Sequence, residues 1–94
     1  PTYHGYRYRM LYRQGEHANG GARDYFNNGV MSNGSALVAW PADYESSGVM
    51  TFIVNPDGVV FQKNLGDDTE NAVKAITSFD PDSTWTAIVN TDTK

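Results

Sequence analysis

The sequence contains no cysteine among its 94 residues. This absence excludes disulfide bonds, thiolate metal sites and cysteine nucleophiles. The chain also has no apolar run close to the ~20 residues of a membrane-spanning helix, and no signal peptide is recognisable at its start. Because it begins with Pro1 instead of methionine, we expect residues 1–94 to be a single domain taken from a larger protein.

Residue types that carry catalysis are scarce. The two histidines, His4 and His17, have no further metal-ligating residues at suitable spacing around them. Neither the Gly-x-Ser-x-Gly elbow of serine hydrolases nor a phosphate-binding loop is present. The side chains of Asp80 and Asp82 alternate as calcium ligands do, but a turn at the end of a helix is the simpler interpretation. We expect no catalytic residues and no cofactor, and a metal site only at this aspartate pair.

Charge is unevenly distributed along the chain. Residues 1–23 carry four arginines and one glutamate, a net charge of +3, whereas residues 24–94 carry three lysines and ten acidic side chains, a net charge of -7. The acidic portion would repel phosphate groups, so nucleic acid is not an expected partner. We expect a basic N-terminal strand beside an acidic body.

Alternation of side chains with a period of two predicts a strand from Tyr3 to Gln14. One side of this strand carries Tyr6, Tyr8, Met10 and Tyr12, and the other carries Arg7, Arg9 and Arg13. Alternation alone predicts that the tyrosine side packs on the core and that the arginine side is exposed. The arginines are therefore the better candidates for contacting a partner, and we expect their joint replacement by alanine to leave stability nearly unchanged.

The middle of the chain predicts a buried strand followed by a hairpin. The apolar run Ser35–Trp40 is short enough for a strand buried on both faces. In Asn55-Pro56-Asp57-Gly58, proline fixes φ at the first central turn position and glycine accepts a positive φ. Val49–Asn55 and Val59–Asn64 should therefore pair antiparallel.

A change of period after Gly66 predicts one helix. Asp67 and Glu70 have the spacing of a capping pair, and Asp80-Pro81 ends the segment because a residue before proline disfavours the α region. The helix should pack on the sheet through an apolar stripe formed by Ala72, Val73, Ile76 and Phe79. Weaker patterns predict a helical turn at Arg23–Asn27 and a last strand at Trp85–Val89. The fold class is α+β, an antiparallel sheet of four to five strands with one C-terminal-half helix on one face.

Four motifs resemble, in their order and spacing, the C-terminal part of a bacterial family known as domain of unknown function 2950. They are His4–Leu11, Gly20–Tyr25, Ala36–Tyr44 and Ser47–Val60. The resemblance extends from His4 to about Trp85. It implies an extracytoplasmic location, periplasmic, envelope-bound or secreted, and a missing N-terminal portion, and it implies no catalytic residues.

The function we expect is binding or assembly through protein–protein contacts. The candidate contact residues are Arg7, Arg9, Arg13, Tyr6 and Tyr8. The partner would be another protein or the missing N-terminal part of the same protein, and self-association is also open. Two alternatives remain. Residues 48–58 are similar to the C-terminal sheet of type IV pilin and pseudopilin heads, and a hydrolytic or metal-dependent enzyme could be completed by a missing segment or subunit.

Overall fold

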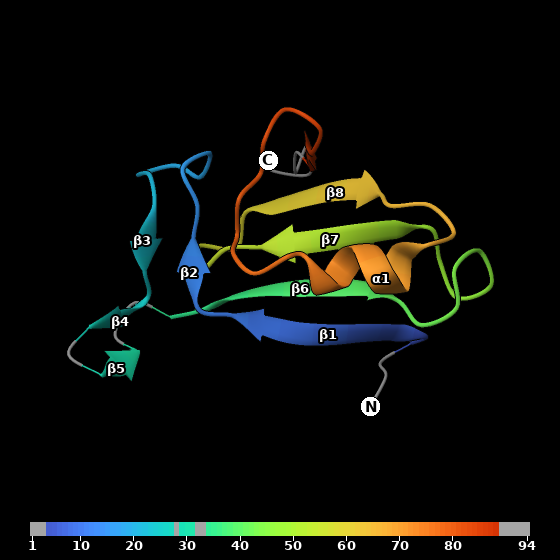
Figure 1. Cartoon of the computed structure of the whole chain (residues 1–94), viewed down its shortest axis with the longest axis horizontal. Coiled ribbons are helices and arrows are strands. Elements are labelled where there is room, and N and C mark those ends of the chain that lie inside the picture. Colours follow the sequence, from blue (N-terminus) through green and yellow to red (C-terminus); the bar gives the residue numbers. More distant parts are fainter. Residues whose placement is uncertain (1–3, 28, 32–33, 89–94) are drawn as a thin grey trace, which may run out of the picture.

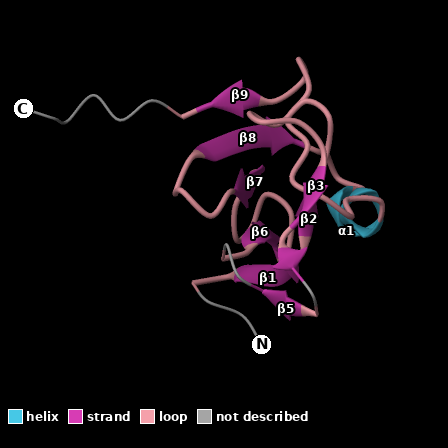
Figure 2. Cartoon of the chain, turned by 90° about the vertical axis from the view of Figure 1, so that its left-hand side faces the viewer, coloured by secondary structure: helices cyan, strands magenta, loops and turns pink. Residues whose placement is uncertain are grey.

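The computed structural model describes residues 4–27, 29–31 and 34–88, and its main body is a five-stranded antiparallel sheet with one helix (Figure 1). The order of strands across the sheet is β1-β6-β7-β8-β9. These strands are β1 (Tyr6–Leu11), β6 (Ala36–Pro41), β7 (Met50–Val54), β8 (Val60–Asn64) and β9 (Thr86–Ala87). Helix α1 comprises Thr69–Lys74 and lies on one face of the sheet (Figure 2). The predicted fold class is confirmed.

The predicted hairpin is present. Strands β7 and β8 pair from Met50 opposite Asn64 to Val54 opposite Val60. In the turn between them, Gly58 has a φ of +87° and its N–H donates to the Asn55 carbonyl at 3.0 Å. The Asn55 side chain accepts two further backbone hydrogen bonds from the turn. The turn chemistry therefore fixes the pairing of these two strands.

The helix is shorter than predicted. Its N-cap is Asp68, which makes no side-chain capping bond, and its last residue is Lys74, so the predicted capping by Asp67 and the helical position of Phe79 are both wrong. The backbone of Phe79 instead accepts a hydrogen bond from Gly15 N–H and donates to the Arg13 carbonyl, both at 2.9 Å. The segment around Phe79 therefore pairs with the N-terminal part of the chain instead of continuing the helix.

Two short ribbons extend from one end of the sheet (Figure 1). They pair β2 (Arg13–Gln14) with β3 (Arg23–Asp24), and β4 (Phe26–Asn27) with β5 (Val30–Met31). The helical turn predicted for Arg23–Asn27 is wrong. Tyr25 explains the difference because it is fully buried, its N–H donates to the Tyr12 carbonyl, and its hydroxyl donates to Gln14.

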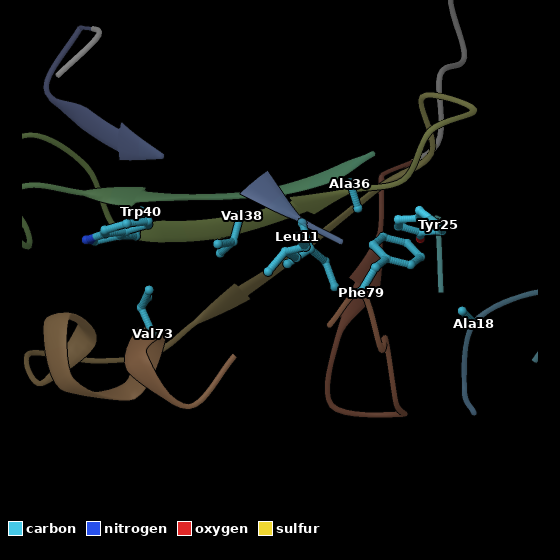
Figure 3. Close-up of a cluster of buried hydrophobic side chains, with 9 residues drawn as sticks. Leu11, Ala18, Tyr25, Ala36, Val38, Trp40, Val73 and Phe79 are labelled. Carbon is cyan, nitrogen blue, oxygen red and sulfur yellow. The ribbon is translucent and has the colours of Figure 1, made fainter. Parts of the chain in front are cut away.

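The hydrophobic core lies between the sheet and the helix (Figure 3). Leu11, Val38 and Ile53 contribute from three adjacent strands, and Val73 contributes from the helix. The core continues toward β2 and β3, where Figure 3 shows Phe79 beside Tyr25. All of these side chains are at most 2% exposed. The short helix is therefore held by packing, since six residues are too few to be helical alone.

Thr51 is the exception in this core, and it provides a test of the packing. Its side chain is fully buried on the helix-covered face of β7, and its hydroxyl has no hydrogen-bond partner among the described residues. Replacement by valine keeps the shape and removes the unsatisfied group. We expect Thr51→Val to raise the free energy of unfolding by about 1 kcal/mol, or the melting temperature by roughly 4–8 °C.

Thermal and urea denaturation of both proteins would measure this gain. Thr51→Ser is the matched control, because it keeps the hydroxyl and removes only the methyl group, and it should destabilise the fold. A valine variant that is less stable than the wild type would show that the hydroxyl has a partner.

Candidate binding surface along the edge strand

The face of the sheet opposite the helix is not buried. Cross-strand pairing places one set of apolar side chains together on this face, which we call the open face: Tyr6, Tyr8, Met10, Leu37, Ala39, Phe52, Val54 and Val60. Each of them is partly or fully exposed, whereas Leu11, Ala36, Val38 and Ile53 on the helix-covered face are buried. Among the residues that the structure describes, no helix covers the open face.

The two sides of β1 are therefore assigned opposite to the prediction. Alternation is confirmed, but the arginine side faces the helix and the tyrosine side belongs to the open face. Tyr8 is 54% exposed and Met10 is 39% exposed. The expectation that the tyrosine side packs on the core is wrong. The side of β1 that carries Arg9 and Leu11 faces α1, and the tyrosine side faces away from it.

Tyr6 lies across the open face and is held there. Its hydroxyl donates to the Met50 carbonyl at 2.7 Å, and its ring centroid is 5.9 Å from that of Phe52. A Cβ atom at Gly48 would lie 2.4 Å from the Tyr6 hydroxyl oxygen, so this position requires glycine for close approach of the ring. Burial raises the pKa of the Tyr6 phenol above its ordinary value. Tyr6 therefore supports the surface, and Tyr8 projects from it.

Arg9 connects the edge strand to the end of the helix. Its guanidinium donates to the carbonyls of Val73 and Ile76, at 2.8 and 3.0 Å. The same group lies 5.9 Å from the ring centroid of Trp40, within the range of a cation–π interaction. These carbonyls are at the C-terminus of α1, where a cation is favoured by the helix dipole. Arg9 thus has a structural role, so joint replacement of the three arginines should lower stability, contrary to the expectation from the sequence. Arg9 also lines the groove described below.

Arg7 and Arg13 are more accessible. The Arg7 side chain is 49% exposed and lies 3.7 Å from the Glu70 carboxylate, a weak surface ion pair. Glu70 also accepts a hydrogen bond from the Trp40 indole at 3.2 Å. Arg13 is exposed and forms no ion pair with the residues of ranges 4–27, 29–31 and 34–88.

A groove of about 610 Å³ lies at the C-terminal end of β1. It is lined by the consecutive residues 9–13, with Asp24, Phe26 and Thr77 on its other sides. Consecutive residues of a strand point to alternate faces, so a groove lined by all of them follows the edge of the strand. Exposed Phe26 packs on Tyr12 with ring centroids 5.6 Å apart. No sequence pattern predicts a role for Phe26, whereas Met10 and Tyr12 share the period of the tyrosines.

The backbone along this edge is unpaired in the described part of the chain. Ala42 N–H donates to the Gly5 carbonyl, so odd-numbered residues of β1 exchange hydrogen bonds with β6. In an antiparallel pair these bonds alternate, which directs the N–H and C=O groups of Tyr6, Tyr8 and Met10 away from β6. The next outward carbonyl, that of Tyr12, is already bound by Tyr25.

The two aspartates predicted as a metal site bind different partners. Asp80 accepts hydrogen bonds from the backbone and ring of His17, at 2.8 and 3.0 Å. Asp82 accepts hydrogen bonds from the hydroxyl and N–H of Thr84, which lower the pKa of its carboxyl group. Within the described ranges, no three His, Asp or Glu side chains form a cluster that could hold a metal ion. We assign both aspartates to the loop that follows the helix.

Comparison with known families agrees with the resemblance of the four motifs. Residues 1–88 match the family described as Protein of unknown function (DUF2950). The chain belongs to this family. No curated protein and no solved structure matches the chain. No helix in the described part of this DUF2950 chain is long and apolar enough to span a membrane.

Arg9 and Arg13 of this DUF2950 chain should differ in their effect on stability. Arg9→Ala removes two charge-assisted hydrogen bonds and the contact with Trp40, and we expect it to lower the free energy of unfolding by about 2 kcal/mol. Arg13→Ala should change it by less than about 0.5 kcal/mol. Urea denaturation of the two variants checks this difference.

Arg9→Lys serves as the control, because it keeps the charge but cannot donate in the same forked geometry. Its stability should lie between those of the wild type and Arg9→Ala. Equal stability of Arg9→Ala and Arg13→Ala would contradict the structural role of Arg9.

The hydrogen bonds to Asp82 predict a pH dependence. Its carboxyl pKa should lie below the ordinary value of about 3.9, and Thr84→Val should raise it because the Thr84 hydroxyl is the main cause of the shift. A lowered pKa stabilises the fold at pH values above the ordinary pKa, and this contribution is lost as the pH falls through the folded-state pKa. The stability difference between wild type and variant should therefore shrink over that range.

Carbon-detected NMR titration of Asp82 measures its pKa directly. Lys63→Gln is the control, because it removes a nearby charge and keeps the hydroxyl, and it should cause a smaller rise. A larger rise in the lysine variant would assign the shift to charge instead of hydrogen bonding.

Proposed function

We propose that this DUF2950 chain is a binding or assembly module that acts outside the cytoplasm through protein–protein contacts. The observation that supports it best is the exposed tyrosine and methionine surface beside the unpaired edge of β1. Exposed apolar side chains that gather on one face are typical of interaction sites. The extracytoplasmic location is supported by the resemblance of the sequence motifs to exported envelope proteins.

The side chains on this surface suit recognition. A tyrosine ring supplies contact area with few rotatable bonds, and a hydroxyl that can bond at the rim of an interface. Tyr8 projects from the middle of β1, next to Met10, whose flexible side chain adapts to different partners. Tyr6 and Phe52 lie on the same face, and their rings pack with centroids 5.9 Å apart. We place the contact surface on these residues and on the adjacent arginines.

No observation on residues 4–27, 29–31 and 34–88 favours the filament-head or enzymatic alternatives. The described carboxylates and imidazoles form no cluster of three that could hold a metal ion. His17 is paired with Asp80 in the loop beyond the helix. The open face supports a contact surface without requiring either a filament or a reaction.

Site-specific crosslinking in the native host tests the proposal. We expect Tyr8→p-benzoylphenylalanine to give a covalent adduct with one defined partner, because the ring at position 8 projects from the open face. The adduct would be identified by mass spectrometry of the crosslinked species. An adduct between two copies of the chain would indicate an assembly module.

Asn71→p-benzoylphenylalanine is the matched control, because Asn71 is exposed on the helix, on the opposite side of the sheet. It should give no adduct or a different one. If position 8 gives no adduct, or if both positions capture the same set of proteins, the open face is not the contact surface.

A further inference from the structure

The unpaired edge of β1 can accept another strand. Tyr6, Tyr8 and Met10 each direct one N–H and one C=O group outward, and this stretch contains no proline. The edge strand has six residues, the usual length of a strand in a sheet. A peptide added along this edge would gain backbone hydrogen bonds regardless of its sequence, and its side chains would meet the two sides of β1 in alternation.

The two sides of this edge have different chemistry. On the open face, an added strand would meet Tyr8 and Met10, which are exposed and apolar over much of their surface. On the helix-covered face it would meet Arg7 and Arg9, and Arg13 lies further along in the same groove. Glu70 lies beside Arg7, and Asp24 lines the groove together with Arg9 and Arg13. Asp43, Glu45 and Asp67 line a pocket with Glu70, so carboxylates gather near the Arg7 end. Among the described residues, Arg9 and Arg13 form no ion pair, so positive charge is unpaired at the groove end of this side.

This charge opposes pairing between two copies of the chain. An antiparallel pair centred on Tyr8 would place Arg7 of each copy directly opposite Arg9 of the other. A shift of the register by two residues would place Arg7 opposite Arg7, or Arg9 opposite Arg9. Like charges at directly opposed positions destabilise a pair of strands. The edge is thus suited to a strand of opposite charge and not to its own copy.

We propose that β1 is extended by a strand from an acidic partner segment, in which Asp or Glu alternates with apolar residues. The acidic side chains face Arg7 and Arg9, and the apolar side chains cover Tyr8 and Met10. Phe26 also lines the groove. This inference rests on the proposed binding function and names the class of partner that the edge recognises.

Fluorescence anisotropy with synthetic peptides tests it. The probe is a labelled, end-capped peptide in which glutamate and valine alternate. We expect it to bind and to bind more weakly as salt is added, because the attraction to the arginines is screened. A peptide with lysine in place of glutamate should bind at least about tenfold more weakly, which corresponds to about 1.4 kcal/mol. N-methylation of every second valine, which removes backbone donors, should cause a loss of similar size.

Two variants of the protein separate strand addition from side-chain contact. Tyr8→Pro removes an outward N–H and leaves the bonds between β1 and β6 intact, since proline is tolerated at such edge positions. It should reduce binding about tenfold. Tyr8→Val keeps the N–H and should bind much more tightly than the proline variant. If Tyr8→Pro fails to fold, the N-methylated peptide still decides the question on the wild-type protein.

Three peptide-binding results would overturn the inference. They are absence of binding by the glutamate–valine peptide, equal binding by its lysine counterpart, and equal binding by the N-methylated peptide. Sedimentation of the protein alone as a dimer that Tyr8→Pro dissolves would also overturn it, because the edge would then pair with its own copy. A crosslinked partner at position 8 without peptide binding would refute the acidic strand and leave the proposed function standing.

Discussion

The contact of Arg9 with the end of helix α1 is the constraint on which the surface of this protein depends. A helix of six residues has no stability of its own, and its last carbonyl groups need hydrogen-bond donors. Arg9 supplies two of them from the edge strand while its guanidinium lies over Trp40. Because side chains alternate along a strand, an inward Arg9 forces Tyr8 and Met10 outward. The same contact that holds the helix therefore creates the open face on the other side.

The end of the helix also determines the shape of the groove. Once the carbonyls of Val73 and Ile76 are bound by Arg9, the chain leaves the helix and Phe79 enters the core. The backbone of Phe79 then pairs with the inner side of β2, while Tyr25 binds the outer side of the same chain at Tyr12. Among the described residues, the chain is thus paired on both sides between residues 12 and 15, whereas the outer side of β1 before it is unpaired. The groove lies where these two environments meet.

The sequence was sufficient for features that depend on neighbouring residues. The turn at Asn55–Gly58 needs only proline, glycine and the asparagine side chain, so the hairpin follows from local chemistry. Alternation in β1 is likewise local. Which side of β1 faces the core is not decided by neighbouring residues, because arginine can be buried when distant carbonyl groups accept its hydrogen bonds. The partners of Arg9 are more than sixty residues away. The predicted length of α1 was wrong for the same reason, because Phe79 is held by residues near the N-terminus.

An unpaired edge beside an apolar face is a hazard for any soluble β-protein, because identical edges can join and aggregate. Here the arginines on the helix-covered side oppose such joining, since two copies would bring guanidinium groups together. They do so without covering the edge, so its hydrogen-bonding groups remain accessible to a chain of different charge. Arg7 and Arg9 thereby combine two properties that usually conflict: a lowered tendency to self-associate and a backbone edge that can still be recognised. Charge on one side of the strand favours an incoming strand of opposite charge over an identical one. It leaves the backbone hydrogen bonds that either strand could form unchanged.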